Sequence, residues 1–220
     1  MRNVTRERSN PFGMRPPCPC RCSGDGDRRA VFGYGDANAD LHVVGDHPGV
    51  HGGAETGVPF TGSAAGERLL AALDRAGVIG YDGGTEPDPR NCFLSYRHLC
   101  CVEDGEDPSS ERYARFDRFF DAEVRAIGAH VLLPVGERTT RHVIEEYTAA
   151  AHRLDVEMDD LHATEVRGRG FLVVPIADPG AWTDHGDRLA AALEDLLARD
   201  YEQLVDLGRF LPGGDPYFVR

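Results

Sequence analysis

Four short apolar runs alternate with amphipathic segments along the chain. The runs occupy residues 41–45, 92–95, 130–134 and 171–175, and large apolar side chains dominate them. Each run is bounded by Gly, Pro or polar residues, which is typical of a strand that is buried on both faces. We therefore predict four strands.

The segments that follow these runs have apolar residues at helical spacing. Ser63 is expected to cap the first helix, and Ser109 or Ser110 the second, because a serine side chain accepts a hydrogen bond from the first helical turn. A third helix follows Gly136, and a fourth covers residues 187–197. The positions expected to face inward are Leu69, Leu70, Leu73 and Ala76 in the first helix, Phe116, Phe119, Phe120, Val124 and Ile127 in the second, and Leu189, Ala192 and Leu196 in the fourth.

This alternation predicts the fold class α/β. Apolar strands that alternate with amphipathic helices form a mainly parallel sheet covered on both faces, here a three-layer α/β/α arrangement with four central strands. Ligands of such sheets bind beyond the carboxyl ends of the strands. A binding site is therefore expected in the loops that begin at Gly45, Tyr96, Pro134 and Ile176.

The chain divides into three parts. Residues 1–30 form an arm with several prolines, a cysteine cluster and no periodicity. Residues 31–205 form the folded domain, and residues 206–220 form a tail. A length of 220 residues suits one domain with such additions.

Composition places the chain among globular proteins, with 41% hydrophobic and 28% charged residues. The apolar runs are too short to cross a bilayer, and the beginning of the chain lacks the apolar centre of a signal peptide. We expect a monomeric cytoplasmic protein that does not bind membranes.

The charge is strongly negative. The formal net charge is -13, and all 24 cationic residues are Arg. An acidic chain without Lys resembles proteins of salt-accumulating microbes such as halophilic archaea, although a GC-rich genome would also replace Lys by Arg. At ordinary salt this charge disfavours nucleic-acid binding, whereas in molar salt, where the Debye length is about 3 Å, it argues little either way.

Several motifs follow one another in a fixed order in and around the segment from residue 43 to residue 77. They are the lead-in FGYGD (32–36), GDHPG (45–49), HG with TG (51–57) and FTG (60–62), followed by strands at 93–100 and 132–136. Together these motifs resemble the uracil-DNA glycosylase superfamily, particularly its iron-sulfur members from archaea and thermophilic bacteria. The likeness spans residues 18–179.

The resemblance implies hydrolysis of the bond between a deaminated base, typically uracil, and deoxyribose in DNA. The base must leave the helical stack and enter a pocket. Asp46 is expected to orient water and to stabilise the cationic sugar, and Phe60 to stack on the base. The Gly-rich turn with Gly45, His47 and His51 is expected to contact the substrate. Simpler roles remain open: Asp46 as a loop cap, the histidines as partners of backbone groups, and Phe60 as a core residue.

Two positions depart from the family pattern. Asp178 stands where members usually have a His that donates to the base, and an ionised carboxylate would repel the developing anion. Either Asp178 is protonated, or a group such as His185 replaces it, or the chain cleaves poorly or acts on something else. Tyr96 stands where many members have an Asn that reads the uracil edge, and a phenol can donate one hydrogen bond and accept one.

The cysteines suggest a metal site. The resemblance implies a four-iron cluster, with Phe116 at the position of the usual fourth ligand, and zinc would accept the same thiolates. Disulfides are not expected in a reducing compartment, and Cys92 is expected to be a small buried residue. The candidate ligands are Cys18, Cys20, Cys22, Cys100 and Cys101.

Two other functions stay open. One is a catalytically silent relative that binds nucleic acid or modified bases. The other is a flavodoxin-like nucleotide-binding module, although no phosphate-binding motif of the G-x-x-x-x-G-K type is present. The candidates for phosphate contacts are Arg28, Arg29, Arg97, Arg138 and Arg141.

Overall fold

The computed structural model describes residues 30–100, 106–149, 151, 153–168 and 170–199. The predicted tail and, apart from Ala30, the predicted arm lie outside these residues. The described strands of the main sheet follow the order β1-β5-β2-β6-β8-β7, and β3 and β4 form a separate pair. The strands are β1 (Tyr34–Gly35), β2 (Leu41–Gly45), β3 (Ile79–Gly80), β4 (Asp88–Pro89), β5 (Cys92–Tyr96), β6 (Val131–Pro134), β7 (Val166–Arg167) and β8 (Leu172–Val173). The helices are α1 (Pro48–His51), α2 (Ala64–Arg75), α3 (Ser110–Ile127), α4 (Glu137–Tyr147), α5 (Met158–Leu161), the short η1 (Pro179–Ala181) and α6 (His185–Ala198).

The four predicted strands form the parallel centre of the sheet. β2 lies between β5 and β6, with Val43 opposite Leu94 on one side and Leu133 on the other, and β6 pairs in parallel with β8. β1 and β7 add antiparallel edges that the sequence pattern did not predict. The α/β class and the mainly parallel centre are thus confirmed, in a sheet two strands wider than expected.

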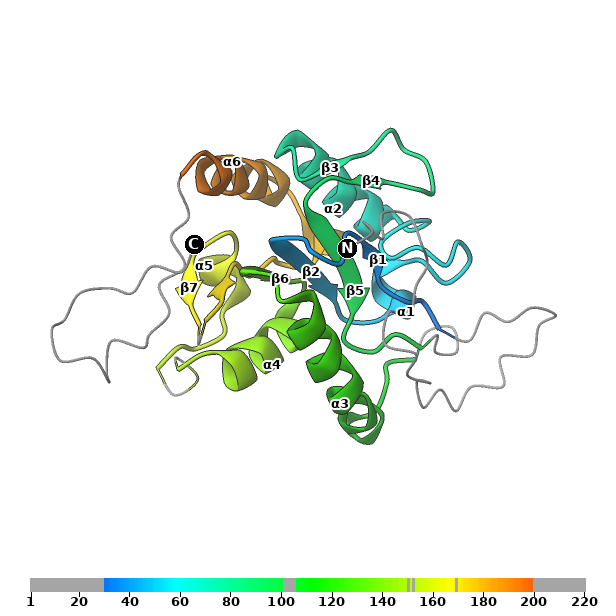
Figure 1. Cartoon of the computed structure of the whole chain (residues 1–220), viewed down its shortest axis with the longest axis vertical. Coiled ribbons are helices and arrows are strands. Elements are labelled where there is room, and N and C mark those ends of the chain that lie inside the picture. The colour runs from blue at the N-terminus through cyan, green and yellow to red at the C-terminus, as the bar shows by residue number, and fades with distance from the viewer. Residues whose placement is uncertain (1–29, 101–105, 150, 152, 169, 200–220) are drawn as a thin grey trace, which may run out of the picture.

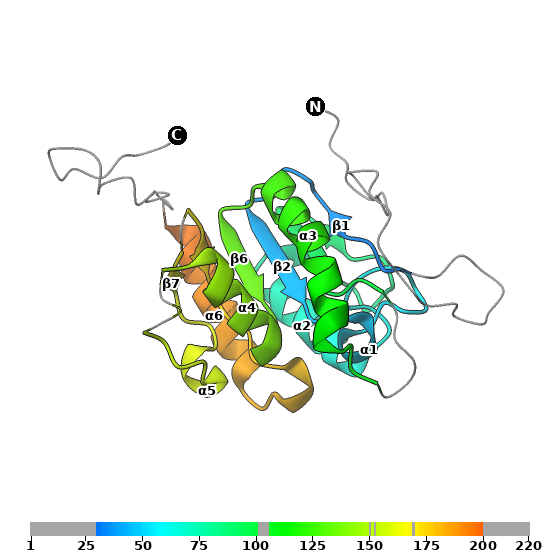
Figure 2. The same cartoon turned by 90° about the horizontal axis from the view of Figure 1, so that it is seen from below.

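Helices cover both faces of this sheet, which gives the three predicted layers (Figure 1). Side chains of α2 and α6, such as Leu69 and Leu189, share one buried cluster with Val43 and Leu133 of the strands. The other face packs against α3 and α4, which lie side by side in Figure 2. Residues that alternate along a strand therefore face two different cores, which explains why the strands are apolar throughout.

The helix starts follow the predicted caps. Ser63 Oγ accepts a hydrogen bond from the amide of Gly66 (3.1 Å), and Ser109 Oγ accepts one from the amide of Arg112 (3.4 Å). α4 begins after Gly136, whose φ of 85° is a conformation that favours glycine. These caps fix where each helix starts relative to the sheet edge.

β8 is shorter than the predicted run 171–175. Pairing continues beyond it, because the amide of Ile176 donates to the carbonyl oxygen of Pro134 at 2.8 Å. Pro134 and Pro175 have no N–H to contribute, so the regular ladder ends early while the strand direction is kept.

Among the described residues, no helix is both long and apolar enough to cross a bilayer.

Candidate active site

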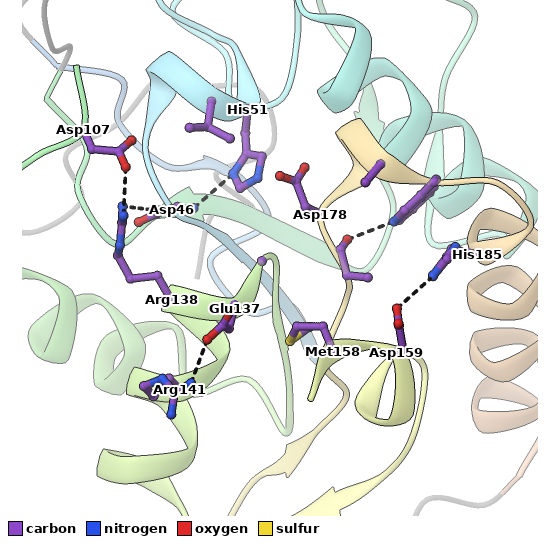
Figure 3. A pocket seen from close by; sticks show the side chains of 15 residues that line it. Asp46, His51, Asp107, Glu137, Arg138, Arg141, Met158, Asp159, Asp178 and His185 are labelled. Carbon is purple, nitrogen blue, oxygen red and sulfur yellow. Dashed lines mark hydrogen bonds and ion pairs between the residues drawn. The ribbon is translucent and has the colours of Figure 1, made fainter. Parts of the chain in front are cut away.

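A cavity of about 690 Å³ opens at the carboxyl ends of the parallel strands (Figure 3). Its walls come from the loops after β2, β5, β6 and β8, represented by Asp46, Asp107, Gly136 and Asp178, together with Arg138 in the first turn of α4 and His185 at the start of α6. These are the four loops in which the sequence predicts a binding site. The fold therefore brings the expected segments together around one pocket.

Asp46 is held in place at the wall of this pocket. Its side chain is 11% exposed and follows directly after β2. The Tyr113 hydroxyl donates to Oδ1 (2.5 Å), and a guanidinium nitrogen of Arg138 donates to Oδ2 (2.9 Å). Each carboxylate oxygen can accept a second hydrogen bond. Asp46 is thus a fixed carboxylate with acceptor capacity left for a water or a ligand.

Arg138 connects Asp46 to a second acid. Its other terminal nitrogen donates to Asp107 Oδ2 at 2.9 Å. This contact is the largest cause of a lowered pKa of Asp107 and of a raised pKa of Arg138. Arg138 was predicted as a phosphate contact, and in the structure it is an ion-pair partner of two pocket carboxylates.

His47 lies behind this cluster. Its Nδ1 accepts the amide of Gly49 (3.2 Å), so the proton is on Nε2, which lies 3.3 Å from Asp107 Oδ1. Burial lowers the pKa of His47, with Asp46 and Asp107 acting in the opposite direction. His47 is not among the residues that line the pocket, so its position suits the bracing of the loop.

His51 lines the pocket and is itself 1% exposed. Its Nδ1 accepts the amide N–H of Asp46 at 3.1 Å. Burial lowers the pKa of His51 to about 4, although the carboxylates of Asp178 and Asp46 act against this shift. The imidazole is therefore neutral at neutral pH, and Figure 3 shows it between Asp46 and Asp178.

Phe60 and Tyr96 are packed together behind His51. Both are almost fully buried, their ring centroids are 5.1 Å apart, and neither lines the pocket. The Tyr96 hydroxyl accepts the amide of Phe60 (2.7 Å) and donates to the carbonyl oxygen of Gly52 (2.8 Å). Gly45 lies against both rings, since a Cβ there would be 2.6 Å from Tyr96. In this arrangement these residues support the wall, and stacking of Phe60 on a base stays a prediction.

Asp178 lines the pocket from the side of β8. Its carboxylate is exposed, and Oδ1 accepts the amide of Gly180 at 2.8 Å, which caps the η1 turn. His185 also lines the pocket, and its Nε2 lies 3.9 Å from Asp159 Oδ1. Through Oδ1, Asp178 therefore acts as a hydrogen-bond acceptor.

Of the predicted metal ligands, Cys100 is described, and Cys18, Cys20, Cys22 and Cys101 lie outside the described residues. Cys100 is fully buried and disulfide-bonded, contrary to the expectation of no disulfides. Ala30, where the arm ends, pairs with Cys100 in an antiparallel bridge. Cys92 is buried as predicted, and burial raises the pKa of its thiol to about 12. No group of three or more potential ligands occurs among the described residues.

Sequence reasoning missed Tyr113 and Asp107. Tyr113 contacts Asp46 from the first turn of α3, 67 positions away in the chain. A signal for it exists: Tyr113, Phe116 and Phe120 recur at helical spacing, and the helix after β5 must begin near the carboxyl edge of the sheet. Asp107 lies in a polar loop with several other acids, so its residue type alone did not distinguish it.

The fold and the pocket define a class of protein: a three-layer α/β/α domain with an anchored carboxylate and a neutral histidine at the carboxyl edge of a parallel sheet. The family model of the uracil DNA glycosylase superfamily matches residues 32–197. The match covers most of the chain, and the chain belongs to this superfamily. The predicted resemblance is thus confirmed.

Several curated relatives carry the name Type-5 uracil-DNA glycosylase. The protein from Pyrobaculum aerophilum is 29% identical over 123 residues, which are 53% of this chain and 53% of the relative. The protein from Thermus thermophilus is 46% identical over 98 residues, which are 44% of this chain and 45% of the relative. The protein from Mycobacterium tuberculosis is 29% identical over 108 residues, which are 47% and 40% of the two chains. These matches span about half of each relative.

Proposed function

We propose that this chain is a DNA base-excision glycosylase that hydrolyses the N-glycosidic bond of uracil or another deaminated base. The observation that carries the proposal is the position of Asp46, a nearly buried carboxylate fixed by Tyr113 and Arg138 at the wall of the pocket. Membership of the superfamily and the names of the relatives point to the same chemistry.

In the proposed reaction, the flipped nucleotide enters the pocket with its sugar facing Asp46. The carboxylate orients a water molecule towards C1′ and stabilises the positive charge that develops on the sugar. The bond between C1′ and the base breaks, and its electron pair goes to the base. The water oxygen bonds to C1′, while one water proton passes to Asp46 and then to solvent.

Tyr113 and Arg138 serve this step by fixing the carboxylate. A catalytic group that is held in one geometry avoids the cost of ordering it in the transition state. Arg138 and Arg141 also bring positive charge to the pocket lining, where a nucleotide phosphate would pass.

The test is an incubation with single-stranded DNA that contains one uracil, in high salt, followed by cleavage at abasic sites. We expect the wild-type chain to release uracil. Asp46→Asn should lower the single-turnover rate about 10²- to 10⁴-fold, because the variant lacks the carboxylate that activates water.

Asp159→Asn is the matched control, since Asp159 lines the same pocket but its side chain is 99% exposed and lies next to His185 rather than Asp46. Its rate should stay within a factor of about three, which is within the usual effect of a surface substitution. Equal losses in both variants, or full activity of Asp46→Asn, would contradict the role of Asp46.

A catalytically silent relative is the second candidate function. Two residues favour it. The Tyr96 hydroxyl is already hydrogen-bonded to the Phe60 amide and the Gly52 carbonyl oxygen, and the Asp178 carboxylate is a hydrogen-bond acceptor at the pocket. Binding of uracil-containing DNA without base release, by the wild-type chain, would support it.

We further propose a four-iron cluster held by Cys100 and cysteines of the arm, with zinc as the alternative. Cys100 is fully buried and pairs with Ala30, the last residue of the predicted arm, so the arm joins the domain next to Cys100. Cys100 would have to be a reduced thiolate to bind the metal. Such a cluster would contribute structural stabilisation of the arm. Iron, sulfide and zinc contents of the purified protein distinguish the two metals.

We also propose a monomer that acts on DNA in the cytoplasm of a salt-accumulating cell, because the chain combines an acidic, Lys-free composition with the site described above.

A further inference from the structure

A nitrogen of His51 is buried without a hydrogen-bond partner at the wall of the pocket. The nitrogen is Nε2, and its residue is 1% exposed. Nδ1 accepts the N–H of Asp46, so the proton of the neutral ring is on Nε2. A buried N–H without an acceptor is unfavourable and is rare in native structures, which indicates that a ligand supplies the acceptor.

Several other donors of the pocket lining already have partners. Arg138 donates to Asp46 and Asp107, and Arg141 donates to Glu137. Nδ1 of His185 is also buried without a hydrogen-bond partner, but it lies 3.7 Å from the carboxylate of Asp184, and Figure 3 shows His185 away from Asp46.

The charge state of His51 suits a donor to a developing anion. Because burial keeps the ring neutral at neutral pH, Nε2–H can donate a hydrogen bond without carrying a full charge that would need a counter-ion. A hydrogen bond of this kind strengthens when the acceptor becomes negative, so it stabilises the transition state more than the ground state.

We propose that His51 donates its Nε2–H to a carbonyl oxygen of the departing base, and thereby takes the role expected of a His at position 178, where this chain has Asp. The inference rests on the proposed function and adds a catalytic residue to it. As the bond to C1′ breaks, the electron pair spreads onto that oxygen. His51 keeps its proton, and the base takes up a proton from solvent after release.

The test compares two leaving bases in otherwise identical single-stranded DNA: uracil, and 5-fluorouracil, whose anion is more stable. His51→Phe keeps a ring but removes both nitrogens. We expect it to lower the single-turnover rate on uracil about 10²- to 10³-fold, the effect of losing a single transition-state donor. The loss on 5-fluorouracil should be at least about tenfold smaller, because a better leaving group needs less stabilisation.

Two further variants control this comparison. His51→Gln retains an amide donor and should recover part of the rate on uracil. His130→Phe makes the matched change outside the pocket, at the opposite end of β6, and should affect both substrates equally and by less than about threefold. Thermal melting of each variant checks that it is folded. An equal loss of His51→Phe on both bases, or no loss, overturns the proposal.

The wild-type imidazole gives a readout that does not need catalysis. Nitrogen-15 NMR should show a neutral His51 with its proton on Nε2 between pH 5 and 8, and added free uracil should shift that proton downfield. A proton on Nδ1, or no shift at saturating uracil, overturns the donor. Absence of base release by the wild-type chain, with the shift present, refutes the proposed glycosylase activity and leaves His51 as a base-binding donor.

Discussion

The single hydroxyl of Tyr96 forms hydrogen bonds with two backbone groups behind the pocket wall. That hydroxyl accepts from the amide of Phe60, which has a φ of 65°, and donates to the carbonyl oxygen of Gly52. A non-glycine residue in this conformation persists only where its surroundings hold it. Tyr96 therefore fixes the loop that presents His51 to the pocket.

We predict that Tyr96→Phe destabilises the domain. The change leaves a buried N–H and a buried carbonyl oxygen without this partner, which costs about 1–3 kcal/mol. Urea unfolding followed by circular dichroism measures the free energy of unfolding. Tyr81→Phe is the control, because Tyr81 is half-buried and its hydroxyl has no hydrogen bond in the described structure, and it should change stability by less than about 0.5 kcal/mol. A stability of Tyr96→Phe equal to that of the control would show that the loop does not depend on this hydroxyl.

At the scale of elements, three buried polar residues, one each from β2, β5 and α3, contact one another away from the pocket. His42 Nε2 lies 2.8 Å from Ser95 Oγ and 3.9 Å from Glu123 Oε1, and all three residues are at most 3% exposed. Burial raises the pKa of Glu123 to about 7, and Ser95 acts against this shift. Burial lowers the pKa of His42 to about 3.

These two shifts give opposite slopes of stability with pH. Between pH 4.5 and about 7, folded Glu123 keeps a proton that the unfolded chain loses, so its contribution to stability falls as pH rises. Between pH 6.5 and about 3, unfolded His42 takes up a proton that the folded chain does not, so stability falls as pH decreases. Glu123 alone therefore destabilises the fold above neutral pH.

We predict that Glu123→Gln stabilises the protein at pH 8 and has no such effect at pH 4.5. The amide keeps a polar contact with Ser95 and removes the cost of a buried negative charge, which we expect to be on the order of 2–3 kcal/mol from a shift of this size. Urea unfolding at both pH values measures the difference. If the free energy of unfolding of the variant differed from that of the wild type by the same amount at pH 4.5 and pH 8, Glu123 would not change its protonation on folding.

The elements also show which parts of the fold a sequence can predict. The four central strands and the four long helices were predicted because their apolar positions repeat over several residues. β1, β7, α1 and α5 are two to four residues long, too short for a period to appear. The site followed the same rule: Asp46 and His51 were found next to a predicted strand, whereas the Tyr113 and Asp107 contacts depend on packing between distant segments.

At the scale of the whole molecule, where the net charge is -13, salt acts on the stability of the fold and on Arg–phosphate contacts with DNA in opposite directions. Self-repulsion among surface carboxylates destabilises the folded chain, and salt screens it, since the Debye length falls from about 10 Å at 0.1 M to about 3 Å at 1 M. Contacts between Arg side chains and phosphate weaken over the same range, because releasing counterions into a more concentrated salt solution is less favourable. A chain of this charge should therefore gain stability from salt while its affinity for DNA decreases.

We predict that the melting temperature rises by about 4–8 °C between 0.1 M and 2 M KCl, which corresponds to roughly 2 kcal/mol for a domain of this size. A triple variant, Glu55→Gln, Glu86→Gln and Glu194→Gln, removes three exposed carboxylates. It should melt higher than the wild type at 0.1 M, and the gap should close at 2 M because screening already removes the repulsion. If the difference in melting temperature between variant and wild type persisted at 2 M, it would come from the individual side chains and not from charge repulsion. A melting temperature that does not depend on salt would contradict the proposed adaptation of the chain to high salt. Because the three positions lie outside the pocket lining, the rate of base release at 2 M should be the same for both proteins.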